Sequence, residues 1–207
     1  MNKKSKTTIA NEESMESRLE QILNDALIKA TDTYSVPPQI IWVDNSTIAT
    51  LGNFSASTGK AKAKKTFNVS ALVAASLSNG TVLNYRACLP EGKRRILYVD
   101  TEQSRYHCHN VLARILKLAG LPTDMDNQNL DFIGLREYTP AIRMEVIDYA
   151  LAHNYGYGLV IIDGIRDLLL DINNAGESVE VINKMMEWSS KYDLHIHCVL
   201  HQNKGDN

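Results

Sequence analysis

Four features that mark particular classes of protein are absent from this 207-residue chain. Its 3 cysteines, Cys88, Cys108 and Cys198, form no CxxC pair, so they predict reduced thiols in a cytosolic protein. The N-terminal residues include lysines but no apolar stretch, which excludes a secretory signal peptide. No apolar run approaches the length that crosses a membrane, so we expect no membrane partner. The formal net charge of −2 means that any binding of nucleic acid needs a local basic patch.

The remaining composition is that of an ordinary soluble globular protein. Hydrophobic residues make up 44% and charged residues 22% of the chain, and its length fits one domain, or one domain with an extension. We expect the extension at residues 1–33, as a polar tail followed by an amphipathic helix over about 15–31. Pro37 and Pro38 then interrupt the pattern. The helix either packs on its own domain or docks on a neighbouring subunit.

Residues 34–207 alternate between predicted strands and helices. We expect strands at 39–43, 52–58, 94–100, 130–135, 157–163 and 195–201, and helices at 65–80, 104–120, 139–154 and 178–193. Near-continuous apolar strands separated by helices are typical of an α/β fold with a parallel sheet covered on both faces. The carboxyl ends of such strands meet at one edge, where ligands bind.

The strand at 52–58 leads into STGKAKAKKTF, which is similar to a phosphate-binding P-loop. The motif G-x-x-x-x-G-K-[ST] is satisfied by Gly59, Lys65 and Thr66, and Lys64 stands in place of its second glycine. A helix begins at about Lys65, and the N–H groups at a helix N-terminus attract phosphate. Lys65 is expected to reach the β- and γ-phosphates, and the Thr66 hydroxyl to ligate Mg²⁺. The expected phosphate-binding residues are Gly59, Lys60, Ala61, Lys62, Ala63, Lys64, Lys65, Thr66 and Phe67.

Lys64 is the one departure from the motif. A P-loop glycine lets the backbone turn tightly around the phosphates, sometimes at positive φ, so a lysine there is expected to carry modest local strain. It also adds charge, because Lys60, Lys62, Lys64 and Lys65 lie within six residues. Such lysines repel one another unless an anion lies between them. A working site, a damaged site and a solvated basic loop all remain open interpretations at this stage.

Two further strands end in carboxylates. The strand at 94–100 runs into Asp100-Thr101-Glu102-Gln103, where a carboxylate either polarises the water that attacks the γ-phosphate or caps the helix starting near Ser104. The strand at 157–163 ends in Asp163, and apolar residues followed by Asp form the Walker B pattern, whose carboxylate holds Mg²⁺ through its water shell.

The last predicted strand ends at His201 and Gln202. Polar side chains at this point are expected to lie beside the γ-phosphate and to report its presence. His195, His197 and His201 lie on the same strand, but their spacing gives no compact set of metal ligands.

This ordered set of motifs over roughly residues 38–207 resembles the RecA-like P-loop ATPases. The set comprises the P-loop, Glu102 after the next strand, an extra strand, Asp163, and a strand that ends in polar residues. It looks closest to the RepA-type hexameric helicases and related mobile-element ATPases. In that family the residue matching Glu102 activates water, and the residue matching His201 or Gln202 senses the γ-phosphate.

The resemblance implies ATP hydrolysis with Mg²⁺, coupled to movement on single-stranded DNA, in a homo-oligomeric ring with nucleotide at subunit interfaces. Lys64 puts the rate of hydrolysis in question more than nucleotide binding. The chain stops just past the strand at 195–201, so we expect the C-terminal part of the fold to be missing. A non-catalytic nucleotide-binding module and a P-loop small-molecule kinase are the alternatives, and scattered arginines argue against the kinase.

Overall fold

The computed structural model describes residues 4–59, 64–170 and 175–201, with side chains for 15–59, 64–170 and 175–200. The chain divides into two compact units, Met1–Val36 and Pro37–Asn207. The first contains helix α1 (Lys4–Ala26), which begins earlier and ends earlier than expected. Its first turns lack proline and glycine, so nothing in their sequence interrupts a helix there. No helix in the described ranges combines the length and apolar character needed to span a membrane.

The second unit is built on a five-stranded parallel sheet in the order β3-β9-β8-β6-β7. Its strands are β3 (Phe54–Gly59), β6 (Arg95–Asp100), β7 (Leu130–Gly134), β8 (Tyr157–Asp163) and β9 (His195–His201). All four pairings within it are parallel. β8 is buried along its whole length, as its run of Leu159 to Ile162 predicts. The expected α/β fold with a helix-flanked parallel sheet is therefore confirmed.

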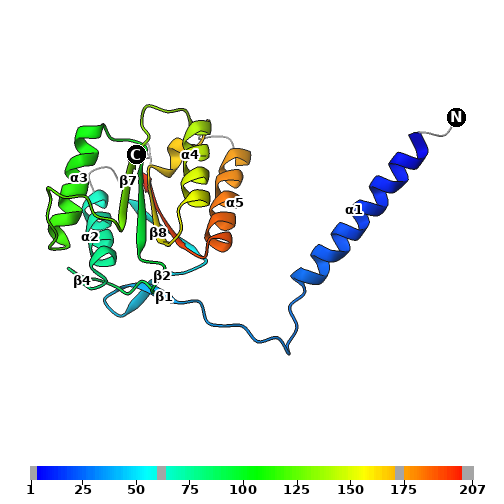
Figure 1. Cartoon of the computed structure of the whole chain (residues 1–207), viewed down its shortest axis with the longest axis horizontal. Helices are drawn as coiled ribbons and strands as arrows, with labels where there is room; N and C mark the ends of the chain where they lie inside the picture. Colours follow the sequence, from blue (N-terminus) through cyan, green and yellow to red (C-terminus); the bar gives the residue numbers. More distant parts are fainter. Residues whose placement is uncertain (1–3, 60–63, 171–174, 202–207) are drawn as a thin grey trace, which may run out of the picture. The chain divides into compact units, whose positions relative to one another are not determined.

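Helices cover both faces of this sheet (Figure 1). Helices α2 (Lys65–Ser78) and α3 (Arg105–Leu118) lie on one face, and α4 (Pro140–His153) and α5 (Ala175–Lys191) on the other. Each begins and ends within a few residues of its predicted bounds. Thr139 caps α4 by accepting a hydrogen bond from the Ile142 N–H, with Pro140 in the first turn. A short 3₁₀ helix, η1 (Ile165–Leu168), follows β8.

A small antiparallel sheet was not foreseen. Its order is β2-β1-β5-β4, formed by β1 (Gln39–Val43), β2 (Ser46–Thr50), β4 (Thr81–Val82) and β5 (Tyr85–Ala87). Only β1 is expected as a strand. β4 and β5 are two and three residues long, and β2 carries little apolar periodicity. Ile40 and Ile41 of this sheet share a buried cluster with apolar residues of α2, so it extends the core beneath that helix.

Candidate functional site

The carboxyl ends of the parallel strands bring the predicted site residues to one edge of the sheet. Asp100 pairs with Asp163 across β6 and β8, and Gly59 pairs with His201 across β3 and β9. The strand β9 lies between the strand of the P-loop and the strand that ends in Asp163. Lys60, Ala61, Lys62, Ala63 and Gln202 fall outside the described residues, and so does the side chain of His201.

Lys64, which occupies the position of the second motif glycine, has a left-handed backbone conformation that glycine adopts without strain. Its φ is 57° and its ψ is 27°, and it is the N-cap residue of α2. A residue with a Cβ loses roughly 1–2 kcal/mol in this region, so the expected local strain is present. The Lys64 carbonyl accepts hydrogen bonds from the N–H groups of Phe67 and Asn68, both at 3.1 Å, which start the first turn of α2.

Lys65 is the first residue of α2 and is buried. Its Nζ donates a hydrogen bond to the Gly59 carbonyl at 2.5 Å, across the segment between them. The ammonium group therefore lies beside the end of β3 and near the N-terminus of α2, where the helix dipole favours phosphate oxygens. Thr66 follows it in the first turn and is half-buried, and Phe67 is exposed.

Asp163 is buried at the tip of β8 and accepts a hydrogen bond from the Tyr98 hydroxyl at 2.9 Å. Burial raises the pKa of Asp163 to about 6, with the charge of Asp100 adding to the rise and Lys65 opposing it. A buried carboxylate beside another carboxylate needs positive charge nearby. Mg²⁺ prefers oxygen ligands and commonly uses one carboxylate with phosphate oxygens. The Asp163 carboxylate and the Thr66 hydroxyl are ligands of this chemistry, and their role in holding Mg²⁺ stays a prediction.

Glu102 lies on the turn after β6. Although the residue as a whole is exposed, burial of its carboxyl group raises its pKa to about 7, helped by the charges of Asp167, Asp163 and Asp100 and opposed by Lys65. A carboxylate whose pKa is near neutrality can take a proton from water at physiological pH. Glu102 lies close to the tip of β8, because a Cβ built on Gly164 would be 2.9 Å from Glu102 Cγ.

Asp100 has a different role from Glu102. It is fully buried, and its Oδ1 accepts from the N–H groups of Glu102 at 3.0 Å and Gln103 at 2.8 Å, while its Oδ2 accepts from Gln103 Nε2 at 2.8 Å. Asp100 therefore stabilises the turn that presents Glu102. The acceptor oxygens of Asp100 are thus used by the turn and not by α3, whose N-cap residue is Ser104.

Three residues that sequence reasoning missed join the tips of β6 and β8. Thr101 is buried, and its Oγ1 lies 3.0 Å from the Asp163 carbonyl oxygen, 2.9 Å from that of Gly164 and 3.0 Å from Asp167 Oδ2. Gly164 has a φ of 99°, and a Cβ there would lie 2.2 Å from Thr101 Oγ1 and 2.9 Å from Glu102 Cγ. Glycine is thus required by this close approach. The partners are more than sixty positions apart, and no local pattern marks them.

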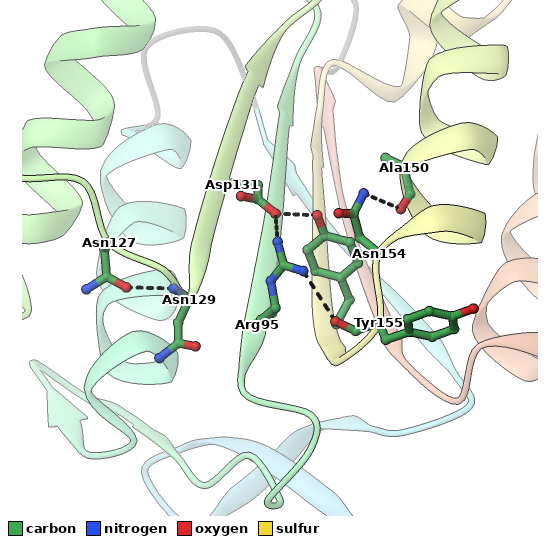
Figure 2. A network of polar contacts seen from close by, with 8 residues as sticks. Arg95, Asn127, Asn129, Asp131, Ala150, Asn154 and Tyr155 are labelled. Atoms are coloured by element: carbon green, nitrogen blue, oxygen red, sulfur yellow. Dashed lines mark hydrogen bonds and ion pairs between the residues drawn. The ribbon is translucent and has the colours of Figure 1, made fainter.

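A second polar cluster lies at the opposite edge of the sheet, where β6, β7 and β8 begin (Figure 2). Arg95 donates to Asp131 at 2.5 Å and stacks over the Tyr157 ring, and the Tyr157 hydroxyl also donates to Asp131. Burial and the Asp131 contact raise the pKa of Tyr157. The cluster borders a hollow of about 710 Å³ between α3 and the start of β8. It joins three strand starts and lies away from the P-loop.

The parallel sheet, its strand order and the groups at its tips are those of a P-loop nucleotide-binding domain. A family model described as AAA domain matches residues 16–207, so the chain belongs to this family of P-loop ATPases. A search of curated proteins finds no match to the chain.

Proposed function

We propose that the chain is the ATP-binding and ATP-hydrolysing part of a RecA-like motor. The proposal is supported by the strand ends: Gly59 ends β3, Asp163 ends β8 and Glu102 follows β6, all at one edge of the parallel sheet, and Lys65 Nζ donates to the Gly59 carbonyl at 2.5 Å. In this proposal the segment from Gly59 to Phe67 holds the phosphates.

Each tip residue then has a separate task. Asp163 and Thr66 would hold Mg²⁺, whose charge would offset that of the phosphate oxygens. Glu102 takes a proton from the attacking water, and the turn built by Asp100 keeps its carboxyl group near the site. His201 and Gln202 respond to the γ-phosphate from the end of β9, the strand beside the P-loop strand.

We further propose that hydrolysis drives movement on single-stranded DNA, in replication or mobilisation of a plasmid or mobile element. The ordered motif set, similar to that of the RepA-type helicases, supports this substrate and a homo-oligomeric ring. The small net charge of −2 means that DNA contact has to come from a local surface.

The main alternative is a module that binds ATP without hydrolysing it, which the strained backbone of Lys64 favours. A small-molecule kinase is less well supported, since Arg143 donates its guanidinium N–H groups to the carbonyls of Leu135, Arg136 and Asp167 and so has a structural role.

Measuring ATP hydrolysis with and without single-stranded DNA separates these functions. A DNA-stimulated rate supports the motor, and ATP binding with no turnover supports the silent module. Phosphate transfer to a small acceptor, with no stimulation by DNA, would indicate the kinase.

A further inference from the structure

β3, the strand that leads into the P-loop, buries few apolar side chains against the rest of the protein. β3 is an edge strand that pairs only with β9 among the strands of the parallel sheet. Its half-buried side chains are Ser55 and Ser57, whereas Phe54, Ala56 and Thr58 are exposed. Burial of two serine side chains contributes little hydrophobic stabilisation compared with burial of Val or Ile. The position of β3 therefore depends on hydrogen bonds.

Two buried histidines of β9 supply side-chain hydrogen bonds to these serines. His195 Nδ1 lies 2.9 Å from the Thr50 carbonyl, and His195 Nε2 lies 2.8 Å from Ser55 Oγ. The same Ser55 Oγ lies 2.8 Å from His197 Nδ1, and His197 Nε2 lies 2.8 Å from Ser57 Oγ. We name this unbroken series, from Thr50 through His195, Ser55 and His197 to Ser57, the His–Ser chain.

The Thr50 carbonyl, at the start of the His–Ser chain, determines which atom donates in every hydrogen bond of the series. The Thr50 carbonyl only accepts, so His195 carries its proton on Nδ1 and accepts at Nε2 from the Ser55 hydroxyl. Ser55 then accepts from His197 Nδ1–H, and His197 Nε2 accepts from Ser57. Burial lowers the pKa of both histidines to about 4, so both imidazoles are neutral near pH 7 as this arrangement requires.

The direction of these hydrogen bonds excludes two other roles for the histidines. A backbone carbonyl cannot pass a proton onward, so the His–Ser chain is no proton path. The Nε2 lone pair of each histidine accepts a serine proton, so neither is available to a metal ion without breaking the series.

We infer that the His–Ser chain positions the phosphate loop against β9, an inference that rests on the proposed nucleotide binding. Ser57 is two residues before Gly59, and β3 and β9 stay in register from Phe54 and Ile196 to Gly59 and His201. The His–Ser chain thus contacts the last residues of β3 before the loop. It holds the P-loop strand at a defined separation from the strand whose end faces the γ-phosphate. Ser55, Ser57, His195 and His197 are therefore positioning residues for β- and γ-phosphate recognition.

The test compares binding of ATP and AMP to Ser57→Ala, well below its melting temperature. AMP lacks the β- and γ-phosphates, so a loop that is out of place weakens ATP binding selectively. We expect Ser57→Ala to bind ATP roughly tenfold more weakly, because β3 loses a hydrogen bond that fixes it to β9. AMP affinity stays within about twofold, and Ser57→Thr, which keeps the hydroxyl, restores ATP binding.

Ser76→Ala is the matched control. Ser76 is buried, and its hydroxyl donates to the Leu72 carbonyl within α2, so the change removes a serine hydrogen bond at a position outside β3. If Ser57→Ala behaves like Ser76→Ala, with a lower melting temperature and an unchanged ratio of ATP to AMP affinity, the positioning role is overturned. If the parent protein binds ATP no better than AMP, the proposed function itself fails, before any variant is considered.

Imidazole ¹⁵N NMR of the parent protein provides a test that needs no variant. Both histidines should carry their proton on Nδ1 near pH 7. A proton on Nε2 of either one is incompatible with the His–Ser chain and overturns the inference.

Discussion

The Nζ atom of Lys65 donates a hydrogen bond to the carbonyl oxygen of Gly59 at 2.5 Å, joining the two ends of the P-loop. This contact uses a lysine that is buried at the start of α2. A bound triphosphate would offer Lys65 charged oxygens, whereas the Gly59 carbonyl is neutral. Charge-assisted hydrogen bonds are about twice as strong as neutral ones, so Lys65 favours the nucleotide.

Lys65→Ala should abolish ATP binding, with a loss of at least about 100-fold in affinity measured by calorimetry. The change removes the buried cation and the contact with Gly59. Lys117→Ala, at an exposed position in the last turn of α3, is the control for loss of one positive charge. Unchanged ATP affinity in Lys65→Ala would contradict the P-loop assignment.

Glu102→Gln should bind ATP normally and lose hydrolysis by about 10²–10⁴-fold, because an amide cannot accept the proton of the attacking water. Binding and turnover are measured on the same preparation. Glu91→Gln, exposed in the turn before β6, tests whether any loss of a carboxylate has this effect. Full activity in Glu102→Gln would remove Glu102 from the reaction.

Lys64→Gly should bind ATP no more tightly than the parent protein, because relief of the left-handed strain is offset by loss of a positive charge. Lys64→Ala removes the charge without relieving the backbone, and we expect it to bind ATP about two- to fivefold more weakly. Equilibrium titration with ATP measures both. A gain of tenfold or more in Lys64→Gly would show that the lysine is a defect in the loop.

Asp163→Asn should stabilise the nucleotide-free protein in a pH-dependent manner. The raised pKa of Asp163 means that the folded state binds more protons than the unfolded state between about pH 4 and pH 6. The Asp163 side chain therefore costs stability increasingly as pH rises through that window. We expect the variant to exceed the parent by on the order of 1–3 kcal/mol at pH 7.5 and by little at pH 4.

Urea unfolding at the two pH values measures this difference. Asp124→Asn, at an exposed loop position, is the control and should show no such trend. If the free energies of unfolding of Asp163→Asn and the parent differ by the same amount at both pH values, the raised pKa of Asp163 is contradicted.

Gly164→Ala should reduce ATP hydrolysis more than Gly52→Ala does. Both glycines have positive φ, but a Cβ at Gly164 meets Thr101 Oγ1 at 2.2 Å, whereas a Cβ at Gly52 meets nothing within 4 Å. Both variants carry a backbone strain of about 1–2 kcal/mol. The difference between their hydrolysis rates therefore reports the clash of the Gly164 Cβ with Thr101. Equal hydrolysis rates in the two variants would show that the contact between Thr101 and Gly164 does not matter for turnover.

Most of the second unit could be predicted from its sequence. Apolar runs such as Leu159 to Ile162 indicate strands buried on both faces, and residues such as Thr139 and Pro140 mark helix starts through local hydrogen bonding. The sequence also predicts local strain at Lys64, because a glycine at this position of the motif allows a tight turn, and the observed φ of 57° agrees. These features depend on nearest neighbours in the chain.

The candidate site was only partly predictable for the same reason. Strand ends identified Glu102 and Asp163, but the role of Asp100 in shaping the turn required the positions of its two oxygens. The cluster of Thr101 with Gly164 depends on β6 and β8 being adjacent, which the chain order alone does not specify.

The sequence by itself determined the alternation of strands and helices, the P-loop with its lysine, and the carboxylates at the strand ends, because each is a property of a short segment. Only the tertiary structure decided that β9 lies beside β3 and brings His195 to Ser55, 140 positions away. The physical reason is that strand order results from packing helices on both faces of the sheet, and residues distant in the chain become hydrogen-bond partners only when that packing is complete.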